Sequence, residues 1–294
     1  MGKLPMDMEL LPPHEDHIFK TIMTHPDAKP ALMDLISAAI GREVADVTII
    51  NNELPITDTG EKTERLDVNC IIDDGSQVDV EMQGSRMIEP SGGHRSFFNK
   101  SVYYLSDLHS SQKSSGVDYD RLVRTYQITF STYTVFPGHK EYLTEGCLRT
   151  RSGRLISDQL NVVFVELSKL KSVLDKPMDE LTSLDMWSVF LGYAQDPKKR
   201  ELINKIIEKK EELVMTSAIL TSISKDDHER AKFRSRRHQE MENAHNLSAS
   251  KRIGIAQGMA QGMAQVARSM KTDGVPFDDI AKFTKLTIDE IEKL

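Results

Sequence analysis

The stretch that decides the fold is RLDVNCIIDDGSQVDVEMQ, which runs from Arg65 to Gln83. Apolar side chains alternate with polar ones on both sides of Asp73–Gly75, which is the pattern of two β-strands. A three-residue loop over Asp73–Gly75 pairs residues whose numbers sum to 148, and Gly75 suits the left-handed position of such a loop. A two-residue loop over Asp74 and Gly75 would mix polar and apolar side chains on both faces. We therefore expect a β-hairpin in the 148 register.

This register gives the hairpin one apolar face and one acidic face, because opposed residues of an antiparallel pair share a face. Asp67 then lies opposite Glu81, with the two β-carbons about 5 Å apart. Like charges placed this way repel, and a hard divalent cation removes the penalty, since Mg²⁺ is usually held by one or two carboxylates plus water and phosphate oxygens. The hairpin is therefore half of a candidate metal site. The alternative is an acidic face that is simply solvated.

Composition describes an ordinary globular chain. It has 294 residues, of which 39% are hydrophobic and 28% charged, with a formal net charge of −7. This charge argues against coating nucleic acid by bulk attraction, so any such contact needs a local basic patch. The two cysteines, Cys70 and Cys147, have no zinc-ligand spacing and fit a reducing compartment. Without a signal-like leader or a run of about 18 apolar residues, we expect a cytoplasmic protein with no membrane contact.

Periodicity along the rest of the chain predicts a mixed sheet flanked by helices, an α/β class. Two short helices are expected between residues 15 and 40, and strands over 121–136 and 160–167. A helix over 95–108 carries an apolar stripe made of Phe98, Val102, Leu105 and Leu108. Tyr103 of the same helix is expected to pack in the core.

The C-terminal third is predicted to be all α-helical, with helices over 181–194, 199–220 and 228–246. The last of these mixes basic and acidic residues, so it is either a solvated face or a nucleic-acid contact. Next comes a repeat of Gly, Met or Ile, Ala and Gln from Gly254 to Gln265, whose small residues recur every fourth position. Three short amphipathic pieces follow over 267–294, and Thr287 with Glu290 has capping-box spacing. These shifts predict domains over 1–172, 173–250 and 251–294.

Several of these segments together resemble the Rpn family of recombination-promoting nucleases and transposases, within the PD-(D/E)XK nuclease superfamily. The likeness covers most of the chain. It rests on the order of six motifs: residues 16–20 (DHIFK), 64–68 (ERLDV), 80–83 (VEMQ), Arg95 with Tyr103 and Tyr104, Tyr119 with residues 127–130 (QITF), and 163–169 (VFVELSK). The resemblance implies a restriction-endonuclease-like core and a metal-dependent DNA endonuclease.

The resemblance also assigns roles to residues. It implies that Asp67 and Glu81 hold the metal, Mg²⁺ or Mn²⁺, that Gln83 is the third motif member, and that Asp16 adds a ligand directly or through water. The superfamily usually has lysine where this chain has Gln83, and an amide cannot act as a general base. Gln83 can still orient a water molecule. Arg95 and Lys100 are candidates for binding substrate phosphate, the alternative being surface ion pairs.

Two other functions remain open from the sequence. The chain could be a catalytically weak DNA-binding or regulatory protein that keeps the nuclease fold, or a protein whose hairpin is merely stabilised by a cation. Separately, the stripe of Gly254, Gly258 and Gly262 predicts a homodimer or higher homo-oligomer, which would dissociate on removal of residues 251–294.

Overall fold

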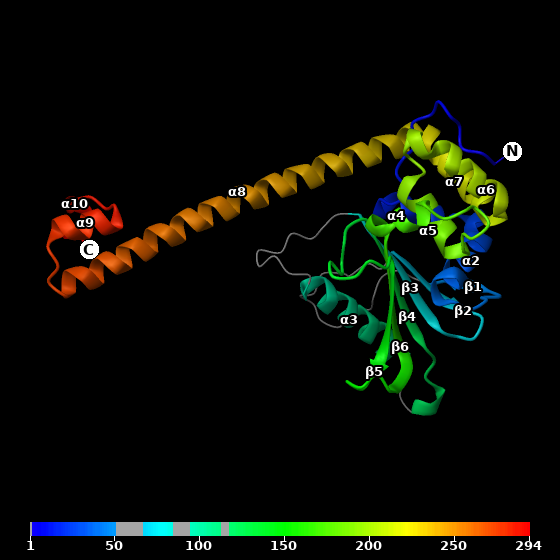
Figure 1. Cartoon of the computed structure of the whole chain (residues 1–294), viewed down its shortest axis with the longest axis horizontal. Coiled ribbons are helices and arrows are strands. Elements are labelled where there is room, and N and C mark those ends of the chain that lie inside the picture. Colours follow the sequence, from blue (N-terminus) through cyan, green and yellow to red (C-terminus); the bar gives the residue numbers. More distant parts are fainter. Residues whose placement is uncertain (1, 51–66, 85–94, 113–117) are drawn as a thin grey trace. The chain divides into compact units, whose positions relative to one another are not determined.

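The computed structural model describes residues 2–50, 67–84, 95–112 and 118–294, and for residues 95 and 96 only the backbone. The chain divides into two compact units, Met1–Arg230 and Ala231–Leu294 (Figure 1). Leu66 of the predicted hairpin and the 64–66 part of the second family motif lie outside the described residues.

A six-stranded mixed sheet forms the centre of the first unit, with the strand order β1-β2-β3-β4-β6-β5. Strands β3, β4 and β6 are parallel to one another, and the other neighbours are antiparallel. This confirms the predicted mixed sheet. The strands are β1 (Val47–Ile49), β2 (Val68–Ile72), β3 (Gln77–Gln83), β4 (Thr125–Ser131), β5 (Leu143–Arg149) and β6 (Leu155–Glu166).

The β2–β3 hairpin has the predicted register, with Val68 opposite Val80 and Asn69 opposite Asp79. Its loop is Asp73–Gly75, closed by a hydrogen bond of 2.8 Å from the Gly75 N–H to the Ile72 carbonyl oxygen. Gly75 has φ +82°, the left-handed conformation that glycine adopts without strain. The apolar and polar side chains therefore separate onto opposite faces of the sheet.

Helices cover both faces of the sheet. Helices α1 (Asp16–Met23) and α2 (Lys29–Ile40), joined by the 3₁₀ turn η1 (Pro26–Ala28), lie on the apolar face, where Phe19 packs against Phe130 of β4. Helix α3 (Arg95–Ser110) lies on the polar face, where Phe97 packs against Phe164 of β6 (Figure 1). Between them these helices enclose the strands that carry the predicted site.

Short helices after the sheet complete the first unit. Packing of α5 and α7 on α2 joins them to the sheet, and the N-terminal segment is tied to them, since the buried Arg200 donates to the Pro5 carbonyl oxygen at 2.6 Å. The elements are η2 (Tyr119–Arg121), η3 (Leu167–Lys169), α4 (Lys171–Leu174), α5 (Ser183–Tyr193), η4 (Pro197–Lys199), α6 (Arg200–Lys209) and α7 (Glu211–Lys225).

The second unit is helical, as predicted. It contains most of α8 (Asp227–Thr272), then α9 (Phe277–Thr284) and α10 (Ile288–Glu292). Ala267, Ile280 and Ile291 form its small core, and the predicted capping box of Thr287 and Glu290 begins α10. No helix in the described ranges combines the length and hydropathy needed to cross a bilayer.

The elements differ from the sequence predictions in five respects. Strand β5 was not predicted, and β4 is much shorter than 121–136 because η2 precedes it and a loop follows Ser131. The expected helix over 199–220 is two helices, since the backbone at Lys210 is extended (φ −136°, ψ 109°). In α3, Val102 is 60% exposed and does not belong to the buried stripe. Tyr103 is 54% exposed, and its neighbour Tyr104 is the buried tyrosine.

Candidate active site

The predicted carboxylate pair comes together where the β2–β3 hairpin ends. Asp67 immediately precedes β2, and its Oδ2 accepts a hydrogen bond of 2.8 Å from the Met82 backbone N–H of β3. Glu81 lies on β3, one residue before Met82 and on the polar face. Burial raises the pKa of Glu81, and the Asp67 backbone N–H at its carboxylate offsets part of this rise. The hairpin therefore holds the two carboxyl groups next to each other, as its register requires.

Asp16 reaches the same place from helix α1, of which it is the first residue. The close packing of α1 on the end of β3 brings it there: a β-carbon at Gly84 would lie only 3.1 Å from the His14 carbonyl oxygen. Burial, then the negative charges of Glu81 and Asp16, raise the pKa of Asp67 to about 10, and the Asp16 side chain also hydrogen-bonds to it. Asp16, Asp67 and Glu81 are thus one electrostatic group.

The polar face of the hairpin is buried rather than solvated. Helix α3 covers it, so that Asp79 is 1% and Glu81 4% exposed. Burial raises the pKa of Glu81, while the Lys100 ammonium and the Gln83 amide act in the opposite direction. Because ionised carboxylates are costly to bury without a cation, this arrangement excludes the solvated alternative.

Gln83 and Lys100 both contact Glu81. The Gln83 amide donates a hydrogen bond of 3.1 Å to Glu81 Oε2, and Lys100 Nζ lies 3.7 Å from the same oxygen. Lys100 comes from α3, and its ammonium lies over the Tyr104 ring, 4.9 Å from the centroid. A cation therefore stands beside the acidic group although position 83 is glutamine. The Arg95 side chain lies outside the described residues.

The residues present fit a divalent cation held by few protein ligands. Glu81 Oε1 is buried and has no hydrogen-bond partner within the described part of the chain. The charges of Glu81 and Asp16 raise the cost of ionising Asp67, and the charge of Asp16 raises that of Glu81. Both features fit a shared divalent cation, because a nearby positive charge lowers the cost of ionising a buried carboxylate. No group of three or more His, Cys, Asp or Glu side chains in the described ranges is placed to hold a metal. A site of this kind takes its other ligands from water and phosphate.

Some polar residues near the site were not predicted. Asp79 lies opposite Gln127 of β4 in the parallel register, and burial and the charge of Glu81 raise its pKa well above the usual value. Tyr104, beneath Lys100, was named as part of a family motif but was given no role at the site. The period-2 pattern of β3 placed Asp79 on the acidic face, but nothing in the sequence showed that α3 would bury that face.

The comparisons with known proteins give one match. The model of a family described as PD-(D/E)XK nuclease family transposase matches residues 13–250, which include every described residue of the site. The chain belongs to this family. No curated protein and no solved structure matches it.

The PD-(D/E)XK assignment agrees with the fold, a mixed sheet with flanking helices. Nucleases of this family generally use divalent metal ions, which suits the paired carboxylates. The match ends at residue 250, before the Gly254–Gln265 repeat and the α9–α10 region.

Proposed function

We propose that this PD-(D/E)XK protein is a metal-dependent endonuclease that hydrolyses phosphodiester bonds in DNA, in recombination or in the movement of a genetic element. The observation that carries the proposal is the pair of half-buried Asp67 and buried Glu81, held together by the hairpin next to Asp16. Neighbouring acids whose pKa values are raised by burial and by nearby negative charge are uncommon unless a cation or a reaction uses them. We place the protein in the cytoplasm.

Each residue of the site has a definite task in this proposal. Asp67 and Glu81 would hold Mg²⁺ or Mn²⁺, with Asp16 as a further ligand directly or through water. A bound divalent ion lowers the pKa of its water and polarises a phosphate oxygen. Gln83 uses its amide N–H to fix Glu81 Oε2, at 3.1 Å, and its carbonyl oxygen can accept a hydrogen bond from a water molecule. Gln83 therefore orients groups but takes no proton.

Lys100 supplies the positive charge that the glutamine lacks. Its side chain is 35% exposed and its ammonium lies 3.7 Å from Glu81 Oε2, so an incoming phosphate would be able to reach it beside the carboxylates. A fixed cation at this position stabilises negative charge that builds up on the phosphate as the bond breaks. Arg95 stays a second candidate for this task.

A plasmid-nicking assay tests the proposal. Purified protein is incubated with supercoiled plasmid and Mg²⁺ or Mn²⁺, beside Asp67→Asn, Glu81→Gln and, as a matched control, Asp120→Asn on the exposed η2 turn. We expect nicking by the unaltered protein and the control, and its loss in the two site variants. No nicking by the unaltered protein, or equal nicking by all four, would reject the enzyme.

The second candidate function is a catalytically weak DNA-binding or regulatory protein with the nuclease fold. Gln83 favours it, because the usual lysine of the superfamily is missing. DNA binding without nicking would support this function. A third outcome, a raised melting temperature with Mg²⁺ but neither binding nor nicking, would indicate a cation with a structural role only.

A further inference from the structure

We propose that the tip of the β5–β6 hairpin, residues 147–156, contacts the phosphate backbone of duplex DNA. The inference rests on the proposed function, since it names the surface by which the same protein would hold its substrate. It concerns a part of the sheet that carries none of the candidate site residues.

The tip concentrates positive charge in a chain that is acidic overall. Arg149, Arg151 and Arg154 lie within it, and no acidic residue occurs from Cys147 to Ile156, whereas the whole chain has a formal net charge of −7. All three arginines are exposed. None of the ion pairs found among the described residues involves them. Their charge is therefore available to an external anion.

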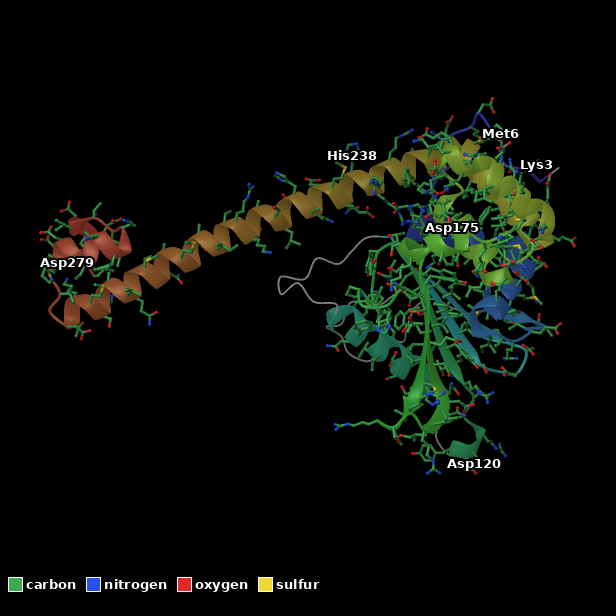
Figure 2. All side chains as sticks on the ribbon, in the orientation of Figure 1. Lys3, Met6, Asp120, Asp175, His238 and Asp279 are labelled. Carbon is green, nitrogen blue, oxygen red and sulfur yellow. The ribbon has the colours of Figure 1, made fainter. Side chains whose placement is uncertain are left out.

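One acidic residue, Asp120 on the η2 turn, lies near the same end of the sheet (Figure 2). Among the ion pairs of the described residues, none joins Asp120 to these arginines. Guanidinium groups form paired hydrogen bonds with phosphate, which makes unpaired arginines suited to a nucleic-acid backbone.

The turn between the strands is held by its own hydrogen bonds. The Thr150 N–H donates to the Arg154 carbonyl oxygen at 2.9 Å, and the Gly153 N–H donates to the Thr150 carbonyl oxygen at 2.9 Å. Thr150 Oγ1 accepts from the Arg154 N–H at 3.0 Å, and Gly153 has φ +88°. Because the backbone is ordered before binding, less conformational entropy is lost on contact.

Exposed apolar side chains flank the arginines. Leu148, Leu155 and Ile156 are 52%, 49% and 58% exposed. Apolar side chains beside arginines on a two-stranded ribbon fit a duplex groove, where they contact sugars and base edges. The register of the two strands shifts near Leu148, and bulges of this kind bend a hairpin away from its sheet.

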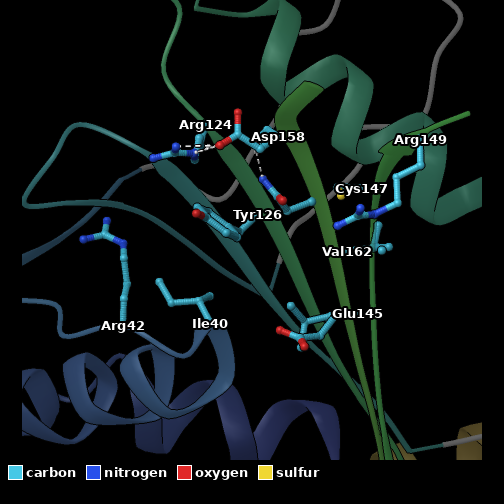
Figure 3. A pocket seen from close by; sticks show the side chains of 12 residues that line it. Ile40, Arg42, Arg124, Tyr126, Glu145, Cys147, Arg149, Asp158 and Val162 are labelled. Atoms are coloured by element: carbon cyan, nitrogen blue, oxygen red, sulfur yellow. Dashed lines mark hydrogen bonds and ion pairs between the residues drawn. The ribbon is translucent and has the colours of Figure 1, made fainter. Parts of the chain in front are cut away.

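The arginines of a groove next to the tip are mostly paired with carboxylates. It has a volume of about 420 Å³ and is lined by Arg42, Arg124 and Arg149, with Glu145 and Asp158 among its other residues (Figure 3). Arg124 Nη2 lies 2.6 Å from Asp158 Oδ2, and Arg42 Nη2 lies 2.7 Å from Asp74 Oδ2. Arg42 and Arg124 of the groove are therefore neutralised by neighbouring carboxylates, and Arg149, the groove arginine without an ion pair among the described residues, belongs to the tip.

The tip and the carboxylate pair can meet the same DNA molecule. Glu81 lies level with Thr129 of β4, and Thr129 with Phe164 of β6. Leu155 begins the same strand. The stretch from Leu155 to Phe164 spans at most about 30 Å at the usual rise of a strand. Roughly nine base pairs cover this length.

Equilibrium binding tests the proposal without any cleavage. A labelled duplex of about 20 base pairs is titrated with full-length protein in EDTA, over roughly 50 to 200 mM salt, and followed by fluorescence anisotropy. The test variant is Arg149→Gln with Arg151→Gln and Arg154→Gln. The control replaces three exposed lysines of the same unit, Lys171→Gln with Lys205→Gln and Lys225→Gln. An Arg151→Gln and Arg154→Gln double variant keeps the hydrogen bond that Arg149 donates to Gly153.

We expect the triple arginine variant to bind roughly tenfold or more weakly, and its salt dependence to fall by about two to three ion equivalents. The double variant should show about two-thirds of the change, and the lysine control should bind like the unaltered protein. Equal binding by the arginine and lysine variants would overturn the inference and leave the endonuclease proposal standing.

The remaining outcomes separate the inference from the proposed function. Absence of both binding and nicking by the unaltered protein would remove the two together. Flotation with vesicles that contain anionic lipid tests the alternative partner of the tip, a lipid surface. If arginine-dependent binding occurs to the vesicles and DNA binding does not depend on these residues, the tip belongs to a lipid contact and the inference is wrong.

Discussion

Asp67 is the site residue whose pKa makes the stability of the fold depend on pH. Burial and two neighbouring acids raise its pKa from 3.8 to about 10 in the metal-free protein. The folded chain therefore keeps a proton that the unfolded chain releases, and the free energy of unfolding falls as pH rises between these two values. This sign is opposite to that of an acid held in an ion pair.

Asp67→Asn should remove this pH-dependent loss, because asparagine has no proton to release. In EDTA we expect the variant to melt a few degrees higher than the unaltered protein near pH 8, and at about the same temperature near pH 4. Thermal melts across this range check it, with Asp120→Asn as the exposed control. A variant that melts below the unaltered protein near pH 8 would show that Asp67 is ionised in the folded state.

Lys100 is the second residue with a sharp prediction. Lys100→Met removes the ammonium that lies 3.7 Å from Glu81 Oε2. We expect single-turnover nicking to slow by about a hundredfold, as when one charge-stabilising group is lost, and Lys100→Arg to recover part of the rate. Lys171→Met is the control. An unchanged rate in Lys100→Met would show that Lys100 does not stabilise charge on the phosphate, and Arg95 would then be the residue to test.

Among the elements, the C-terminal end of β6 holds the loop that follows β4. Glu166 is fully buried, and its Oε1 accepts from the Val135 N–H at 2.6 Å and from the Phe136 N–H at 3.1 Å. Its Oε2 lies 2.6 Å from Lys169 Nζ, which also donates to the Phe136 carbonyl oxygen. One carboxylate thus fixes a loop, a strand end and a helical turn.

Glu166→Gln should lower the free energy of unfolding by about 3 kcal/mol or more, because it leaves the Lys169 ammonium buried without its counter-ion. Urea denaturation measures this, with Glu145→Gln on the exposed part of β5 as control. A loss of less than about 0.5 kcal/mol would mean that Lys169 turns out to solvent at little cost.

The same elements show what sequence can and cannot predict. The register of the β2–β3 hairpin was predictable because a shift by one residue moves every side chain to the other face, and Gly75 selects the loop. Strand β5 gave no such signal: it contains Gly146, where an added β-carbon would lie 2.9 Å from Val162 Cγ2, so that Val162 would have to shift. Gly in a strand weakens the pattern that predicts it.

Helix α3 was placed correctly, but its buried side was predicted only in part. Leu105 and Leu108 of the predicted stripe are buried, whereas Val102 is exposed, and Phe97, Ser101 and Tyr104 are buried as well. Helix α3 covers a face of acids and amides, so its inner surface includes a serine and Lys100 instead of an unbroken apolar stripe. The carboxylate pair was therefore predictable from the strands, but the residues of α3 that pack over it were not.

At the scale of the whole molecule, the family match accounts for the sheet and the candidate site but not for the C-terminal repeat. The first unit, Met1–Arg230, contains the whole sheet and every described candidate site residue. The repeat lies in α8 beyond the matched residues, and β-carbons built at Gly254, Gly258 and Gly262 meet no atom within 4 Å. Three exposed glycines within one helix lower its stability, so we expect them to serve a contact of α8.

Self-association supplies that contact and is the prediction for the intact chain. Ile255, Met259 and Met263 recur every fourth residue along α8 and are 54%, 63% and 39% exposed. We expect light scattering to give a dimer or larger species, and Met259→Glu with Met263→Glu to shift it to monomer. Gln257→Glu with Gln261→Glu adds the same charge to another face of α8 and should leave the assembly intact. A dimer supplies two active sites for the two strands of a duplex, so the charge variant should still nick plasmid while linearising it more slowly. Unaltered protein that runs as a monomer at micromolar concentration would remove both parts of the prediction.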